Sequence, residues 1–154
     1  MNSLVIYFSK FGHTQLVAET VGTVLKSHGP TLVVGMDQVT VGELTAADLV
    51  VAGTPTHKMN LPETVRPFLD TLPRRILNGT PVAAFDTSYR MSPFQARFTA
   101  AKKLARKLHG KRVVSPETFH VEGREGPLYP GELDRARDYA ARILDNLPDR
   151  APSA

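Results

Sequence analysis

An anion-binding combination of residue types follows the first apolar run of the chain, in Ser9-Lys10-Phe11-Gly12-His13-Thr14. Ser9 and Thr14 carry hydroxyl groups that can donate hydrogen bonds to phosphate oxygens, and Gly12 allows a tight turn with close backbone approach. A helix-period segment begins at Thr14, so free amides and the positive end of a helix dipole would point at the same place. The pattern predicts a phosphate-binding nest, with a simple β–α turn capped by Thr14 as the alternative.

Two further polar segments also stand at the ends of apolar runs. Thr54-Pro55-Thr56-His57 follows the run at 49–53, and Asp86-Thr87-Ser88-Tyr89 closes the run at 81–86. Parallel α/β sheets bind ligands beyond the carboxyl ends of their strands, where the winding direction reverses. We therefore expect the three segments to form one site.

The elements that must position these segments alternate along the chain as a parallel α/β sheet requires. Strands are predicted at 4–8, 31–34, 49–53, 81–86 and 113–121, the last at a sheet edge because Pro116 interrupts it. Helices are predicted at 14–27, from about Thr64 with Pro67 in the first turn, from between Ser92 and Thr99 to about His109, and after Gly131. The last two helices should bury Phe98, Ala101, Leu104, Ala105 and Leu108, and Leu133, Ala136, Ala140, Ile143 and Leu147.

The three polar segments resemble the flavin-binding loops of the flavodoxin family. The first matches the family's phosphate signature, [ST]-x-[STYF]-G-x-T, and Gly53-Thr54-Pro55-Thr56 matches its G-[ST]-P-T turn. The resemblance extends from Leu4 to about Leu147 and implies a flavodoxin-like doubly wound five-stranded parallel sheet. Its strand order would be 2-1-3-4-5, with helices on both faces. Residues 1–148 would form one domain, and 149–154 a flexible C-terminal tail.

The resemblance also implies the cofactor, flavin mononucleotide (FMN), and a role for each segment. The segment from Ser9 to Thr14, including Lys10, Phe11, Gly12 and His13, would wrap the FMN phosphate, and Thr54-Pro55-Thr56 would contact the phosphate and the ribityl chain. His57 stands where the family often has a tryptophan against the inner flavin face. Asp86-Thr87-Ser88 would bond the ring through backbone groups, and Tyr89 would stack on its outer face. Acidic residues that many family members carry near this loop are missing, and Arg90 stands there.

Other chemistries lack their motifs in the 154 residues. Without cysteine, the chain has no disulfides, iron–sulfur ligands or thiol nucleophile. It lacks G-x-G-x-x-G, the P-loop pattern, a G-x-S-x-G elbow and histidine spacing typical of metal sites. A receiver domain would need acidic residues where Ser9-Lys10 and Thr54 stand.

The net charge of +4 arises largely from a stretch without acids between Arg97 and Arg112. This stretch is interpreted as a solvated helix face or as a docking face for an acidic partner. The stretch lacks interleaved aromatic residues, which argues against nucleic acid as a partner. The absence of a signal-peptide pattern and of a run long enough to span a bilayer favours a cytoplasmic protein.

The leading functional hypothesis is an FMN-binding electron-transfer protein that works with a redox partner, either a reductase or an acceptor. One alternative is an FMN-dependent NAD(P)H:quinone oxidoreductase on the same scaffold. The other is a binding or regulatory module that holds FMN weakly or not at all.

Overall fold

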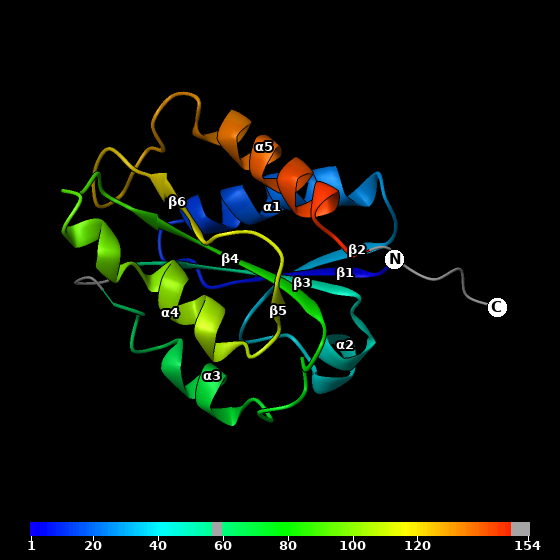
Figure 1. Cartoon of the computed structure of the whole chain (residues 1–154). Helices are drawn as coiled ribbons and strands as arrows, with labels where there is room; N and C mark the ends of the chain where they lie inside the picture. Colours follow the sequence, from blue (N-terminus) through cyan, green and yellow to red (C-terminus); the bar gives the residue numbers. More distant parts are fainter. Residues whose placement is uncertain (57–59, 149–154) are drawn as a thin grey trace.

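A parallel β-sheet lies at the centre of the computed structural model, which describes residues 1–56 and 60–148 (Figure 1). The strands are β1 Ser3–Tyr7, β2 Thr31–Gly35, β3 Leu49–Pro55, β4 Pro81–Ser88, β5 Lys111–Arg112 and β6 Glu117–His120. Their order is β2-β1-β3-β4-β5, and β6 also pairs with β4. The predicted order 2-1-3-4-5 is confirmed.

The edge of the sheet beyond β4 is split into two short strands. β5 pairs with Pro81 and Val82 at the start of β4, and β6 pairs with the segment 85–88 at its end. A single strand over 113–121 was predicted, and that prediction is wrong in its bounds. Pro116 lies between the two pieces and has no amide to donate, so the ladder is interrupted at an edge position, as its presence indicated.

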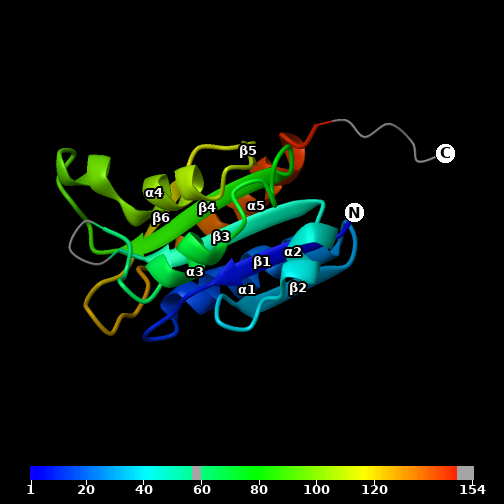
Figure 2. The same cartoon turned by 90° about the horizontal axis from the view of Figure 1, so that it is seen from below.

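Helices cover both faces of the sheet, as predicted. α1 His13–Lys26 and α5 Glu132–Asp145 lie on one face, and α2 Val41–Ala46, α3 Arg66–Thr71 and α4 Ala100–Lys107 lie on the other (Figures 1 and 2). α2 was not among the predicted elements. It begins with a capping box in which Thr40 Oγ1 accepts from the Glu43 amide (3.1 Å) and Glu43 Oε1 accepts from the Thr40 amide (2.8 Å).

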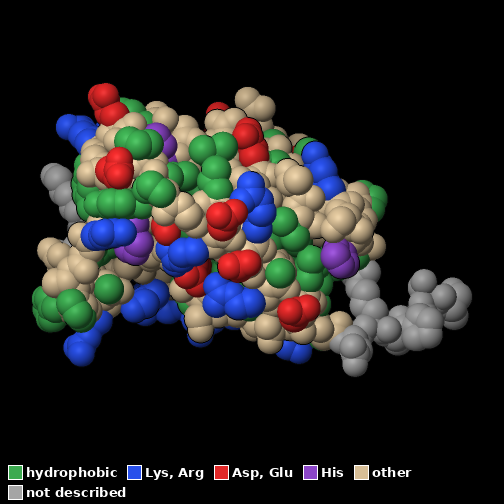
Figure 3. Space-filling model, turned by 90° about the horizontal axis from the view of Figure 1, so that it is seen from above, with side chains coloured by type: hydrophobic (Ala, Val, Ile, Leu, Met, Phe, Trp, Pro, Cys, Tyr) green, Lys and Arg blue, Asp and Glu red, His purple; other side chains and the backbone are tan. Residues whose placement is uncertain are grey.

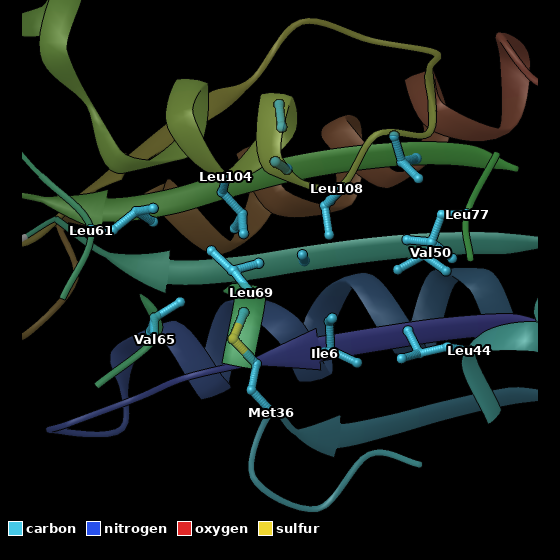
Figure 4. Packing of buried hydrophobic residues seen from close by; sticks show 14 of the residues in the cluster. Ile6, Met36, Leu44, Val50, Leu61, Val65, Leu69, Leu77, Leu104 and Leu108 are labelled. Carbon is cyan, nitrogen blue, oxygen red and sulfur yellow. The ribbon is translucent and has the colours of Figure 1, made fainter. Parts of the chain in front are cut away.

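The sheet separates two apolar clusters. On the α2–α4 face, Ile6 and Val50 of the sheet pack with Met36, Leu69 and Leu104 (Figure 4). On the α1–α5 face, the rings of Phe85, Phe119 and Tyr139 meet edge to face, with centroids 5.8–6.4 Å apart. Both faces of the central strands are therefore buried, which accounts for their continuous apolar runs.

The final helix buries most of the face predicted for it. Ala136, Ala140 and Ile143 are fully buried, whereas Leu133 and Leu147 are only partly buried. Tyr139 is buried as well, although it was not predicted, because its hydroxyl finds a partner by donating to the Ala84 carbonyl (2.9 Å). Burial raises the pKa of this phenol.

Phe98 departs from its predicted position on the buried face of the fourth helix. It ends a 3₁₀ turn, Gln95–Phe98, and its side chain is 43% exposed beside Phe94. Thr99 is extended (φ −74°, ψ 152°), so α4 begins one residue later and the helical period does not reach back to Phe98. The rest of that predicted face is buried, namely Ala101, Leu104, Ala105 and Leu108.

Positive and negative side chains are interspersed on the face that α1 and α5 cover (Figure 3). Three arginines of α5 form ion pairs there: Arg135 with Glu132 and Glu117, Arg137 with Asp134, and Arg142 with Glu117. No helix within the described part of the chain is long and apolar enough to cross a membrane.

Candidate functional site

A cleft of about 830 Å³ lies at the carboxyl ends of β1, β3 and β4. Its volume is within the range of roughly 300–1,000 Å³ that small-molecule sites occupy. It brings together most of the residues predicted for the site: Ser9, Lys10, Phe11, His13, Thr14, Pro55, Thr56, Thr87, Ser88 and Tyr89. The loops predicted from three separate parts of the sequence therefore meet at one place.

The loop after β1 turns at Gly12, which is the N-cap of α1 and has φ 91°. This left-handed conformation favours glycine, and a Cβ at this position would meet no other atom within 4 Å. The Gly12 amide donates to Ser9 Oγ (3.0 Å), so the loop is closed on itself. Within the described residues, the amides of His13, Thr14 and Gln15 have no protein acceptor and stand at the positive end of α1.

Thr14 does more than end the loop. Its side chain is buried, and its Oγ1 lies 2.8 Å from Thr87 Oγ1 in a hydrogen bond that either hydroxyl can donate. This bond joins the start of α1 to the end of β4. Thr14 therefore connects two of the three loops through its hydroxyl, and it also lines the cleft.

The turn after β3 divides into a buried residue and residues at the cleft. Thr54 is fully buried and does not line the cleft, whereas Pro55 and Thr56 do. Thr56 Oγ1 accepts a hydrogen bond from the Ala100 amide (3.0 Å) at the first residue of α4. His57 lies outside the described residues.

Asp86 was predicted in a loop contacting the flavin, and the structure corrects its position. β4 continues to Ser88, and Asp86 is fully buried within it and does not line the cleft. Its carboxyl accepts hydrogen bonds from the Thr56 hydroxyl and from the Ala101 amide (3.3 Å). Burial raises the pKa of this carboxyl, although hydrogen bonds from Thr118 and Thr56 oppose the rise. Asp86 ties β4, the turn after β3 and the N-terminus of α4 together beneath the cleft.

Two exposed aromatic side chains line the cleft. Tyr89 is 48% exposed after β4, and Phe11 is 41% exposed in the loop after β1, with Lys10 Nζ 5.5 Å from its ring centroid. Thr87 and Ser88, by contrast, are buried and present little more than backbone and hydroxyl groups. Aromatic surface and hydrogen-bonding groups therefore meet in one cleft.

Several lining residues were missed from the sequence. Arg66 is the first residue of α3, the segment 60–64 leads into that helix, and Arg124 comes from the loop after β6. No motif marks them, since all of them lie outside the three signature segments. Among the described lining residues, Lys10 and the two arginines are three cationic side chains against one carboxylate, that of Glu63.

These features fit a ligand that joins a phosphate to a flat aromatic ring. Open amides at the start of α1 and nearby cations suit a phosphate dianion, while Tyr89 offers a ring for stacking. FMN has both parts.

Comparison with known proteins identifies the family. The flavodoxin domain model matches residues 4–130. No curated protein is found to match the chain.

Solved structures of flavodoxins share its fold. Oxidised flavodoxin 1 from Bacillus cereus superposes with a TM-score of 0.76 at 18% identity, covering 96% of this chain and 100% of the other. A flavodoxin from the domain Archaea gives 0.75 at 19% identity, covering 94% and 97%. A WrbA-like flavodoxin from Agrobacterium tumefaciens gives 0.73 at 23% identity, covering 94% and 95%. Because the family model spans most of the sequence and the sheet has the flavodoxin strand order, the chain belongs to the flavodoxin domain family.

Proposed function

We propose that this protein binds FMN in the cleft and transfers electrons between redox partners. One observation carries the proposal: the first-turn amides of α1 lack protein acceptors in the described structure and lie beside a cleft that all three signature loops line. A helix N-terminus in this setting is suited to a phosphate monoester.

Each loop has a task in this proposal. The amides of His13, Thr14 and Gln15 would hold the phosphate, and the backbone of 87–89 would orient the ring against Tyr89. His57 is proposed to cover the other face of the ring. When bound, the flavin supplies the redox chemistry, and the protein contributes binding, orientation and electrostatics.

The charges of the cleft should make reduction easier. Lys10, Arg66 and Arg124 outnumber Glu63, and electron uptake adds negative charge near them. We therefore expect reduction potentials above those of flavodoxins whose cleft is acidic. A redox titration that places the potentials as low as in acidic flavodoxins would contradict this.

We propose that the redox partner presents an acidic docking surface. Phe94 (65% exposed) and Phe98 pack against each other in the turn before α4, and the basic residues Arg97, Lys102 and Lys103 are close to them in sequence. Exposed aromatic rings with arginine nearby are typical of protein interfaces, and the stretch between Arg97 and Arg112 contains no acid. The cytoplasmic location stays a prediction from the sequence.

Two measurements test the function. Calorimetric titration of the apoprotein should show one FMN bound per chain, and an absence of heat and of bound flavin would favour a module that does not use FMN. Stopped-flow mixing of the FMN-loaded protein with NADPH should then show no rapid reduction. Rapid direct reduction would instead identify an NAD(P)H-dependent oxidoreductase.

A further inference from the structure

The loop at 122–127, between β6 and α5, has a shape fixed by its own hydrogen bonds. Val121 and Leu128 form an antiparallel bridge at its base. Within it, the Glu122 amide donates to the Pro127 carbonyl (2.8 Å) and the Gly126 amide donates to the Gly123 carbonyl (2.9 Å). The loop therefore presents its side chains from a defined backbone.

This loop is anchored on the first residue of α1. His13 Nε2 lies 2.6 Å from the Glu125 carbonyl oxygen, to which it donates. Gly126 (φ 93°) packs so closely that a Cβ there would lie 2.1 Å from the His13 ring. The 122–127 loop is thus held against the same helix N-terminus whose amides are open.

The anchored loop brings Arg124 to the lining of the cleft, next in sequence to Glu125, whose carbonyl bonds His13. Glu122 and Glu125 flank Arg124 in sequence, yet it forms no ion pair with any acid of the described chain. The arginines of α5 that line no cleft, Arg135, Arg137 and Arg142, are all paired. A guanidinium without a carboxylate partner, carried by a loop anchored at a helix start whose amides are open, is suited to a phosphate.

We propose that Arg124 binds the terminal phosphate of the flavin, and that His13 is a positioning residue that holds the 122–127 loop in place for it. This inference rests on the proposed FMN binding. It adds a guanidinium to a phosphate site that the signature loop would otherwise form from amides, hydroxyls and the Lys10 ammonium. The site then distinguishes a phosphorylated flavin from riboflavin, which has the same ring and no phosphate.

Calorimetry of the apoprotein with FMN and with riboflavin tests the role of Arg124. In R124Q the Kd for FMN should rise about tenfold or more, the usual effect of losing a charged hydrogen bond, while the Kd for riboflavin stays unchanged. R112Q is the matched control, because Arg112 is an exposed arginine in β5, which pairs with the far end of β4; its Kd values should equal those of the wild type.

Three results would overturn the assignment. If R124Q weakens the binding of FMN and of riboflavin equally, Arg124 does not recognise the phosphate. If FMN binding is unchanged, Arg124 makes no contact with the flavin. A wild-type protein that binds neither flavin would remove the proposed function itself, which separates that failure from the other two. Far-UV circular dichroism and unfolding midpoints verify that R124Q is folded.

The role of His13 is tested in two backgrounds. H13A should weaken FMN binding in the wild-type chain and change it little in R124Q, because the loop then no longer carries the guanidinium that His13 positions. The same loss in both backgrounds would mean that His13 does not act through Arg124 and would refute the positioning role.

Discussion

Replacing Gly53 with alanine should displace β3 at the point where it bonds the start of the loop after β1. A Cβ at Gly53 would lie 2.1–2.6 Å from three atoms of the Phe85 ring in the neighbouring strand. That ring is held by Phe119 and Tyr139, at 5.8 and 6.4 Å between centroids. Because the Gly53 carbonyl also accepts from the Phe8 amide (3.0 Å), any strand displacement would reach the start of the anion-binding loop.

The loss in the free energy of unfolding can be worked out from the packing around Gly53. Overpacking a closely packed core typically costs about 1–3 kcal/mol, because side chains leave their preferred rotamers and backbones shift. In a domain of this size each kcal/mol lowers the melting temperature by about 2–4 °C. We expect G53A to lose about 2 kcal/mol, which corresponds to about 4–8 °C. Urea unfolding followed by circular dichroism measures the free energy directly.

A double-mutant cycle with F85L shows whether the ring is responsible. Leucine lacks the ring atoms that the new Cβ would meet, so G53A should cost at least 1 kcal/mol less, roughly, in the F85L background than in the wild type. If G53A unfolds at the wild-type midpoint, or if the two costs simply add, the packing around Gly53 is not as described.

Thr14, Asp86 and Gly42 provide three further tests of the structure. T14V removes the bond to Thr87 and leaves a buried hydroxyl without a partner, so it should lose about 1–3 kcal/mol in urea unfolding; no change would show that this bond does not join α1 to β4. Since burial raises the pKa of Asp86, the folded protein holds that proton more tightly than the unfolded chain does, and stability should fall as pH rises above the usual carboxyl pKa. D86N should remove this fall in unfolding midpoints measured from about pH 4 to pH 8, whereas D70N at an exposed site should keep it; identical pH profiles for wild type and D86N would contradict the buried position. G42A adds a Cβ that meets only Thr40 Oγ1 at 3.9 Å on the exposed α2, so it should raise the free energy of unfolding by about 0.5 kcal/mol, and a loss would be inconsistent with that space.

The arrangement of the signature loops could be predicted from sequence because each follows an apolar run. The types and spacing of Ser9, Gly12 and Thr14 marked the loop after β1, and the alternation of runs placed the other two loops at the same edge. The strand order that the flavodoxin resemblance implied then indicated which loops meet, and the sheet has that order.

The residues that sequence misplaced or missed depend on contacts or backbone turns that no local pattern reveals. Asp86 was placed in a flavin-contacting loop by the flavodoxin resemblance, yet it is buried in β4 and accepts hydrogen bonds from Thr56 and Ala101. Phe98 was assigned to a helix face because it fits the period, but the extended Thr99 ends that period. Arg124 had no local signal, since contacts of Glu125 and Gly126 with His13, which is distant in sequence, hold its loop at the cleft.

α2 is the opposite case. Its sequence contains a helix-start signal but no helical period of apolar residues. Thr40 and Glu43 have the capping-box spacing, but the helix has six residues and buries only Leu44. A helix that short cannot display an apolar stripe, so only its cap could have revealed it.

FMN binding by the cleft is tested most directly by one absorbance measurement on the purified protein, made after FMN is added and free ligand is removed by desalting. The open amides of α1 and the three converging loops predict flavin absorbance that elutes with the protein at one FMN per chain. Flavin that elutes entirely in the small-molecule fraction, from protein shown to be folded by circular dichroism, would contradict the assignment of the cleft as a flavin site.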